Sequence, residues 1–303
     1  MSVIDIGSNT IKHLVAASGM RILEHGSEDV RIGTGMGKEG PVRLLPEAMR
    51  AAADCVSDLW ESAEAFSPTK RAIVATSAVR DAVNRDEFIA MVKADTGAEI
   101  RVLSGEEEAQ YVGAGVARDP NISAYKPFYL MDLGGGSLEL LEYSGGIVRQ
   151  KVSLPLGAVR LKEKLVRDAS AALSPGEMAE IGDYIALTVA ASGFSFHNPG
   201  ALIGTGGGLT HARFMIAAQE GVKKSDSSPT VKIHDMRRLM RKLAALTLAE
   251  RLAIKNLPPT RADIMPVALV VITTVMELAM ASSIVHSFYN LRYGLAAELL
   301  GEK

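Results

Sequence analysis

The sequence predicts an α/β protein built from two domains with mixed sheets. Its 303 residues suffice for two domains, and 48% apolar with 22% charged residues is typical of a globular protein. An apolar run, a glycine-rich turn and a hydroxyl residue occur twice, as DIGSNT at residues 5–10 and DLGGGS at residues 132–137. Strand hairpins followed by strand–helix alternation favour mixed sheets. The repeated turn therefore predicts a duplicated domain.

The first domain is predicted to span residues 1–122. Residues on either side of the turn at 7–9 have the pattern of a hairpin. Helical spacing of apolar residues follows, and Ser104 with Glu107 three residues later fits the capping box that begins a helix. The predicted elements are strands at 3–6, 11–16, 28–32, 72–75 and 100–103, and helices at 46–65, 84–96 and from 104 onward.

The second domain is predicted to span residues 123–303. Residues 118–127 hold two prolines among polar neighbours, which makes them the best linker candidate. Residues 128–153 repeat the opening pattern of strand, glycine turn, strand, hairpin and strand. The further predictions are a strand with a glycine turn at 202–210, a mobile loop at 223–230, and mostly helix at 234–300 with a break at 257–259. The last helix could pack back on the first domain.

Composition argues against several classes of function. The net charge of −2 gives no basic field that would attract nucleic acid. The single Cys55 rules out an intramolecular disulfide and a cysteine zinc site, and the six histidines lack the spacing of a zinc helix. Asp5 and Lys12 interrupt the early apolar stretch, and the longest apolar run, at 266–276, is too short to span a bilayer. We therefore expect no membrane partner and a cytoplasmic location.

Apolar residues near the C-terminus leave two alternatives open. They could build the core of one chain or the contact face of a homodimer, and the core is the favoured interpretation. The residues concerned are Leu269, Val270, Ile272, Val275 and Leu278.

The repeated glycine turns predict a site for phosphate groups. Backbone N–H groups in such turns point outward together, glycine permits a close approach, and the hydroxyl adds a donor. The aspartate before each turn, Asp5 or Asp132, can hold a divalent cation that bridges phosphate oxygens. A third turn, GTGGG at 204–208, could bind another part of an anionic ligand or simply join a strand to a helix. Two turns in register suggest a phosphate chain held between the two halves.

Charged residues near these turns have two interpretations each. The carboxylates of residues 106–108 could serve only the helix dipole, or one of them could face a cleft and accept a proton from water. Arg80 could grip phosphate in a bidentate manner or form a surface ion pair. Lys12, one strand step past the first turn, could also meet an anion.

Taken together, these motifs resemble the exopolyphosphatase / guanosine pentaphosphate phosphohydrolase family, part of the superfamily of actin, sugar kinases and heat-shock chaperone ATPases. The match runs in order from residue 3 to about 298. Its segments are residues 5–12, 31–36, 75–84, 104–109, 132–139, 153–160, 204–207, 261–264 and 293–295. Longer members carry an additional C-terminal helical domain, so this chain resembles a short, two-domain member.

The resemblance implies two ribonuclease-H-like (actin-like ATPase) domains with an interdomain cleft. It also implies Mg²⁺-dependent hydrolysis of the terminal phosphoanhydride of inorganic polyphosphate, or of the 5′-γ-phosphate of guanosine pentaphosphate. By motif match, Glu108 is the implied general base, with Glu107 as the alternative if the register slips by one. Asp132 and Glu139 are implied to place Mg²⁺ or water, and Asp5 is a further metal candidate.

The same match implies the phosphate contacts. Arg80 is the expected phosphate clamp. The expected phosphate-binding positions are Ser8, Asn9, Thr10, Lys12, Gly134, Gly135, Gly136, Ser137, Gly206 and Gly207.

Several functions remain as alternatives at this stage. The leading expectation is an exopolyphosphatase, and the nearest alternative is a guanosine pentaphosphate hydrolase. A regulator that binds guanosine tetra- or pentaphosphate without hydrolysing it comes next, followed by a kinase. The presence of both Glu108 and Glu139 favours an enzyme over a pure sensor.

Overall fold

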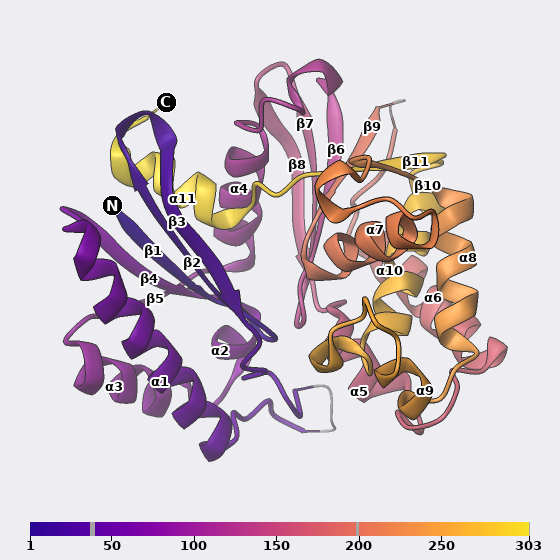
Figure 1. Cartoon of the computed structure of the whole chain (residues 1–303), viewed down its shortest axis with the longest axis horizontal. Helices are drawn as coiled ribbons and strands as arrows, with labels where there is room; N and C mark the ends of the chain where they lie inside the picture. The colour runs from indigo at the N-terminus through magenta and orange to yellow at the C-terminus, as the bar shows by residue number, and fades with distance from the viewer. Residues whose placement is uncertain (37–39, 198–199, 303) are drawn as a thin grey trace.

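The computed structural model describes residues 1–36, 40–197 and 200–302, which form two mixed β-sheets standing side by side (Figure 1). The first sheet consists of β1 (Ser2–Ile6), β2 (Ile11–Ala17), β3 (Arg21–Glu28), β4 (Arg71–Ala75) and β5 (Ile100–Val102). β1, β2 and β3 form an antiparallel meander, while β4 and β5 run parallel to β1. The strand order is β3-β2-β1-β4-β5.

The second sheet repeats this arrangement. It consists of β6 (Phe128–Leu133), β7 (Leu138–Ser144), β8 (Ile147–Leu154), β9 (Ala201–Thr205), β10 (Thr230–Lys232) and β11 (Ser283–His286). β6, β7 and β8 again form a meander, and β9 and β11 continue the sheet parallel to β6. Only β10, antiparallel at the edge, has no counterpart in the first sheet. The shared topology confirms two ribonuclease-H-like domains of the actin-like type.

Helices cover the outer faces of both sheets. The first sheet carries α1 (Pro46–Ser62), α2 (Ser77–Asp81) and α3 (Arg85–Thr96), and the second carries α5 (Ala158–Leu165), α6 (Pro175–Ala191), α7 (Gly207–Gln219), α8 (Ile233–Ala244), α9 (Leu248–Leu252) and α10 (Met265–Leu278). Successive residues of β1 point to opposite faces, so Ile4 joins the core under α1 and α3 whereas Val3 faces the middle of the molecule. No helix in the described part of the chain is long and apolar enough to cross a membrane.

The apolar residues of α10 belong to the core of the single chain. Leu269, Val270, Ile272 and Val275 are buried in the largest core cluster, and Leu278 packs against it. α10 contacts α6, α7 and α8, which surround it. The first of the two alternatives for this segment, core packing, is therefore the observed one.

Two helices fill the space between the sheets. α4 (Gly105–Val116) packs on β7 and β8, and α11 (Leu291–Leu300), the yellow helix in Figure 1, packs on β1 and β2 of the first sheet. Their backbones approach so closely that a Cβ at Gly294 would overlap the carbonyl oxygen of Tyr111. The capping box of Ser104 and Glu107 that the sequence predicts does begin α4. Residue 108 thereby lies at the junction of the two sheets.

One prediction of local structure was wrong, and others were incomplete. The third strand is Arg21–Glu28 rather than 28–32, because it is an exposed, polar edge strand that shows little hydrophobic signal. The segment after it bonds to the first glycine turn instead, with Arg31 N donating to Asn9 O at 2.9 Å and Gly33 N to Ser8 O at 2.8 Å. Residues 223–230 do form a loop, with a 3-10 turn at Lys224–Asp226, and its mobility stays a prediction. The region 234–300 is mostly helical as predicted, and it also contains the short strand β11. The helices α5 and α6 had not been predicted.

Replacing Gly294 by alanine is expected to destabilise the protein by at least about 2 kcal/mol, because the new methyl group meets backbone rather than a movable side chain. Thermal or urea unfolding measures the change. The matched control is Gly182→Ala in α6, where the nearest atom to a Cβ, Thr274 Oγ1, lies at an ordinary 3.5 Å. Helix propensity should make that variant about 1 kcal/mol more stable. Equal unfolding free energies for the two variants would contradict the close α4–α11 contact.

Candidate functional site

A cavity that is open to solvent lies between the two domains. The first domain lines it with the end of β1, the turn that follows and the start of α4, and the second with the β6–β7 turn and the start of α7. Most of the predicted site residues line this cavity. They are Asp5, Ser8, Asn9, Thr10, Lys12, Glu108, Asp132, Gly134, Gly135, Gly136, Ser137, Glu139 and Gly207.

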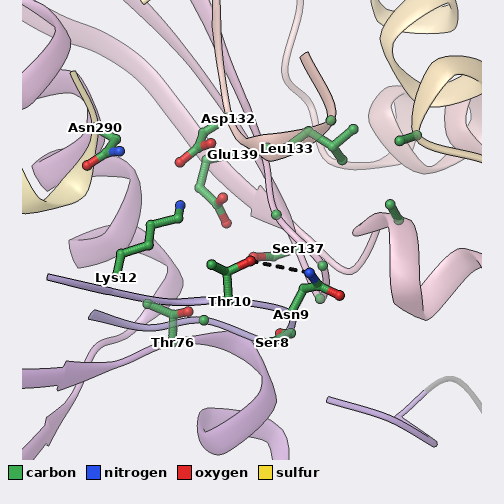
Figure 2. A pocket seen from close by; sticks show the side chains of 18 of the residues that line it. Ser8, Asn9, Thr10, Lys12, Thr76, Asp132, Leu133, Ser137, Glu139 and Asn290 are labelled. Carbon is green, nitrogen blue, oxygen red and sulfur yellow. Dashed lines mark hydrogen bonds between the residues drawn. The ribbon is translucent and has the colours of Figure 1, made fainter. Parts of the chain in front are cut away.

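Equivalent hairpins place charged side chains on both sides of the cavity. Asp5 on β1 pairs in register with Lys12 on β2, and Asp132 on β6 pairs with Glu139 on β7. Figure 2 shows the Lys12 side chain of the first domain pointing toward Asp132 and Glu139 of the second. The duplicated topology therefore brings the carboxylates of both domains to one cavity.

The two glycine turns contact each other across the domain junction. A Cβ at Gly136 would overlap the hydroxyl oxygens of Ser8 and Ser77, so a side chain at this position would displace both hydroxyl groups. The second turn is held from behind because the carbonyl oxygens of Gly135 and Gly136 accept from Val159 N at 2.9 Å and from Arg160 Nε at 2.8 Å. Arg160 also pairs with Asp81 of the first domain, which ties the turn to both domains.

Glu108 is a buried carboxylate in the wall of the cavity. Only 7% of the residue is exposed, and Arg80 Nη1 donates to its Oε2 at 2.7 Å. Burial raises the pKa of Glu108 to about 7, although the Arg80 guanidinium opposes the shift. A carboxyl group that titrates near neutrality can accept a proton from water.

Arg80, Glu106 and Glu107 are absent from the described residues that line the cavity. Arg80 lies behind Glu108 and also donates to Leu103 O at 3.2 Å. Arg80 forms an ion pair with the buried Glu108, and its expected role as a phosphate clamp stays a prediction. Glu107 accepts from Ser104 N and Arg101 Nη2 on the exposed side of α4, and Glu106 is exposed. Of the three carboxylates, Glu108 is the one that reaches the cavity.

The third glycine turn is divided between the cavity and the protein interior. Gly207 lines the cavity at the start of α7, whereas Gly206 is absent from the described lining residues. Gly206 has a φ of 103°, and a Cβ there would overlap the carbonyl oxygen of Leu133. Its glycine is therefore required by the backbone turn itself.

The buried carboxylates repel one another. Burial raises the pKa of Asp5, of Asp132 and, more strongly, of Glu139 above their usual ranges. For Glu139, the nearby carboxylates of Glu108 and Asp132 add to the effect of burial. A bound cation would lower this electrostatic cost, as protons do at lower pH.

The donor set fits one particular mode of metal binding. The described residues contain no group of three or more His, Cys, Asp or Glu side chains arranged to hold a metal ion. Mg²⁺, however, is commonly bound through one or two carboxylates together with waters and substrate phosphate oxygens. Asp132 and Glu139, neighbours on β6 and β7 in the cavity wall, fit that mode.

Sequence reasoning missed three polar side chains of the cavity. Thr76 follows β4, Asn290 caps α11, and Arg261 enters from the 3-10 turn Pro259–Arg261 of the second domain. Arg261 lies over Gly207, and its buried Nε has no hydrogen-bond partner within the described ranges. The same holds for Ser8 Oγ and Asn9 Oδ1. The segment 261–264 had been noticed as a motif, but its place beside the first glycine turn depends on the tertiary fold.

The chain is similar to known proteins in sequence and in structure. The sequence model of the Ppx/GppA phosphatase family matches residues 10–303, and the chain belongs to this family. Family membership supports a hydrolase that acts on phosphate compounds of the polyphosphate or guanosine polyphosphate kind.

Solved structures are similar over the whole chain. An exopolyphosphatase from Cytophaga hutchinsonii is 25% identical, with a TM-score of 0.87 over 100% of this chain and 98% of that one. The Aquifex aeolicus PPX-GPPA enzyme is 21% identical, with a TM-score of 0.78 over 98% of both chains. An exopolyphosphatase-like protein is 24% identical, with a TM-score of 0.86 over 98% of this chain and 97% of that one. The last two likenesses support the fold.

Glu139→Gln is expected to change how stability depends on pH. Because the folded pKa of Glu139 is raised, the folded state keeps a proton that the unfolded state has lost, so stability falls as pH rises from about 4.5 upward. Glutamine removes that loss. In thermal unfolding without divalent cations, the variant should match the wild type near pH 5 and melt at a higher temperature near pH 8. Parallel pH profiles would contradict the raised pKa of Glu139, and the exposed Glu106→Gln is the control.

Proposed function

We propose that the protein is an exopolyphosphatase that releases orthophosphate from the end of inorganic polyphosphate. The observation that carries this proposal is Glu108, a buried carboxylate that titrates near neutrality and lines the same cavity as both glycine turns. The similarity to an exopolyphosphatase of 25% identity supports the same substrate class.

The proposed reaction is direct attack by water on the terminal phosphorus atom. The terminal phosphate lies between the two turns, where Ser8, Asn9 and Ser137 offer donors. Glu108 accepts a proton from water as the new O–P bond forms. The bond from phosphorus to the bridging oxygen breaks, and the electron pair leaves with the shortened chain. Arg80 keeps the Glu108 carboxylate oriented and lowers the cost of its charge.

Magnesium is part of the proposal. Asp132 and Glu139 would hold the ion, with Asp5 nearby on β1. When bound, Mg²⁺ would neutralise charge on the phosphate oxygens. Lys12 reaches the same space from β2 and would contact the phosphate chain directly.

A guanosine pentaphosphate 5′-phosphohydrolase is the second candidate. The observation that favours it is an apolar part of the cavity wall, formed by Leu133, Ile264, Met265 and Ala268. An inorganic phosphate chain gains nothing from apolar surface, whereas a nucleoside base does.

One assay separates the two candidates. Phosphate release is measured side by side from long polyphosphate, short polyphosphate and guanosine pentaphosphate, with and without Mg²⁺. The proposal expects Mg²⁺-dependent release from polyphosphate at a higher kcat/KM than from the nucleotide. Higher kcat/KM for the nucleotide would favour the second candidate. Binding of the guanosine nucleotides without any release would indicate a regulator instead.

Glu108→Gln is expected to lower kcat by about 10²–10⁴-fold, because it removes the proton acceptor while keeping the size of the side chain. The wild-type rate should fall below about pH 7, where the carboxyl becomes protonated, and the residual rate of the variant should lack that fall. Glu106→Gln, two residues earlier in the same helix and exposed, serves as the control. Near wild-type turnover by Glu108→Gln would refute its role as the base.

A further inference from the structure

One carboxylate outside the cavity joins the phosphate-binding elements of the two domains. Asp29 follows β3 and is absent from the described residues that line the cavity. Its Oδ1 accepts from Asn9 Nδ2 at 3.1 Å and from Thr10 Oγ1 at 2.8 Å, both in the first glycine turn. From the second domain, Arg261 Nη2 donates to the same oxygen at 2.7 Å, and Thr260 Oγ1 donates to Oδ2 at 2.6 Å.

Arg261 depends on this carboxylate for its charge balance. The side chain of Arg261 is only 11% exposed, and Asp29 is its ion-pair partner. Arg261 Nη2 also donates to Thr10 Oγ1 at 2.9 Å, which closes a triangle of Asp29, Thr10 and Arg261. With Nη2 held by the triangle, the unpartnered Nε and the Nη1 above Gly207 stay beside the cavity. Leaving such a buried cation unpaired is costly, so the triangle fixes its place.

A second ion pair crosses the same junction with the charges exchanged. Arg31 Nη2 lies 2.6 Å from Asp263 Oδ2, and Lys162 Nζ lies 2.9 Å from the same oxygen. These three residues are absent from the described lining of the cavity. The Arg31–Asp263 pair therefore bridges the domains, and none of its residues lines the cavity, which makes Asp263 a matched comparison for Asp29.

We propose that Asp29 is a positioning residue of the cavity, fixing Thr10 and Arg261 relative to each other across the domain junction at the expense of affinity for the phosphate chain. This inference rests on the proposed function, because it concerns the same phosphate site. Arg261 and Thr10 are the groups that face the ligand, and Asp29 acts through them.

Charge and geometry make opposite contributions at Asp29. Its negative charge cancels that of Arg261 and repels an incoming polyanion, so removing the charge strengthens binding. Its four hydrogen bonds hold the donors in register, so disturbing them slows the chemical step, for which small displacements matter. A purely structural role would instead lower stability, affinity and turnover together.

The test compares three variants, Asp29→Asn, Asp29→Glu and Asp263→Asn. Binding of inorganic tripolyphosphate is measured by calorimetry in a Glu108→Gln background, so that the probe is not consumed. Phosphate release, as kcat and KM, is measured with Glu108 intact, and melting temperature is recorded for every variant. The substitution Asp29→Asn removes the charge, and Asp29→Glu keeps the charge but shifts the oxygens.

Asp29→Asn should bind tripolyphosphate about three- to tenfold more tightly while its kcat falls about tenfold or more. Asp29→Glu should bind within about twofold of the wild type and also lose kcat. Asp263→Asn should change both quantities by less than about twofold. These outcomes together would support the positioning role.

Other results overturn the inference. Weaker binding, lower kcat and a lower melting temperature in Asp29→Asn would show a structural role only. Wild-type values of both affinity and kcat in Asp29→Asn, with an active parent enzyme, would overturn the inference and leave the proposed function standing. A parent protein that neither binds tripolyphosphate nor releases phosphate would overturn the proposed function, and the inference with it.

Discussion

The rest of the structure depends on the burial of several negative charges between two copies of one fold. The hairpin of the first sheet brings Asp5 to the cavity and the equivalent hairpin of the second brings Asp132 and Glu139. Because these carboxylates are buried, each raises the energy of the others. Such an arrangement is stable only beside groups that can neutralise it. The same carboxylates therefore affect both stability and ligand binding. A ligand that neutralises their charge stabilises the folded protein, and this gain in free energy contributes to its affinity.

The two central helices determine which carboxylate reaches the cavity. α4 begins at a capping box, so its first turn is fixed with respect to the strand that precedes it. The contact of Gly115 and Gly294 with the facing backbone then holds α4 against α11, between the sheets. In this geometry Glu107 serves the cap on the outside while Glu108, one position later, turns into the cavity. The two adjacent glutamates have different surroundings, because successive residues of a helix point in different directions.

Much of the fold and part of the site could be predicted from the sequence. The repeated turn revealed the duplication, and glycine with aspartate after an apolar strand has a local meaning that does not depend on distant residues. The edge strand β3 and the short strands β10 and β11 were not predicted from the sequence. Their own residues show too little hydrophobic pattern, and they are strands because they pair with neighbouring strands of the sheet. The pairing of Arg80 with Glu108 could not be predicted, because the two residues are distant in sequence. Asp29 and Arg261 could not be connected at all, since only the packed domains bring them together.

The balance of charge around the cavity supports the proposed divalent cation. Arg80 is paired with Glu108, and Arg261 is paired with Asp29, so neither offers a full positive charge to a ligand. The positive charge of Lys12 favours the ionised forms of Asp5 and Asp132. The charge of Arg292 also favours the ionised form of Asp5. A phosphate chain adds further negative charge to a space where negative charge is already in excess. Hydrogen bonds from the glycine turns can orient such a ligand, but they cannot cancel its charge. A cation shared between the carboxylates and the phosphate oxygens would relieve both repulsions at once, which is why ligand and metal are expected to bind together.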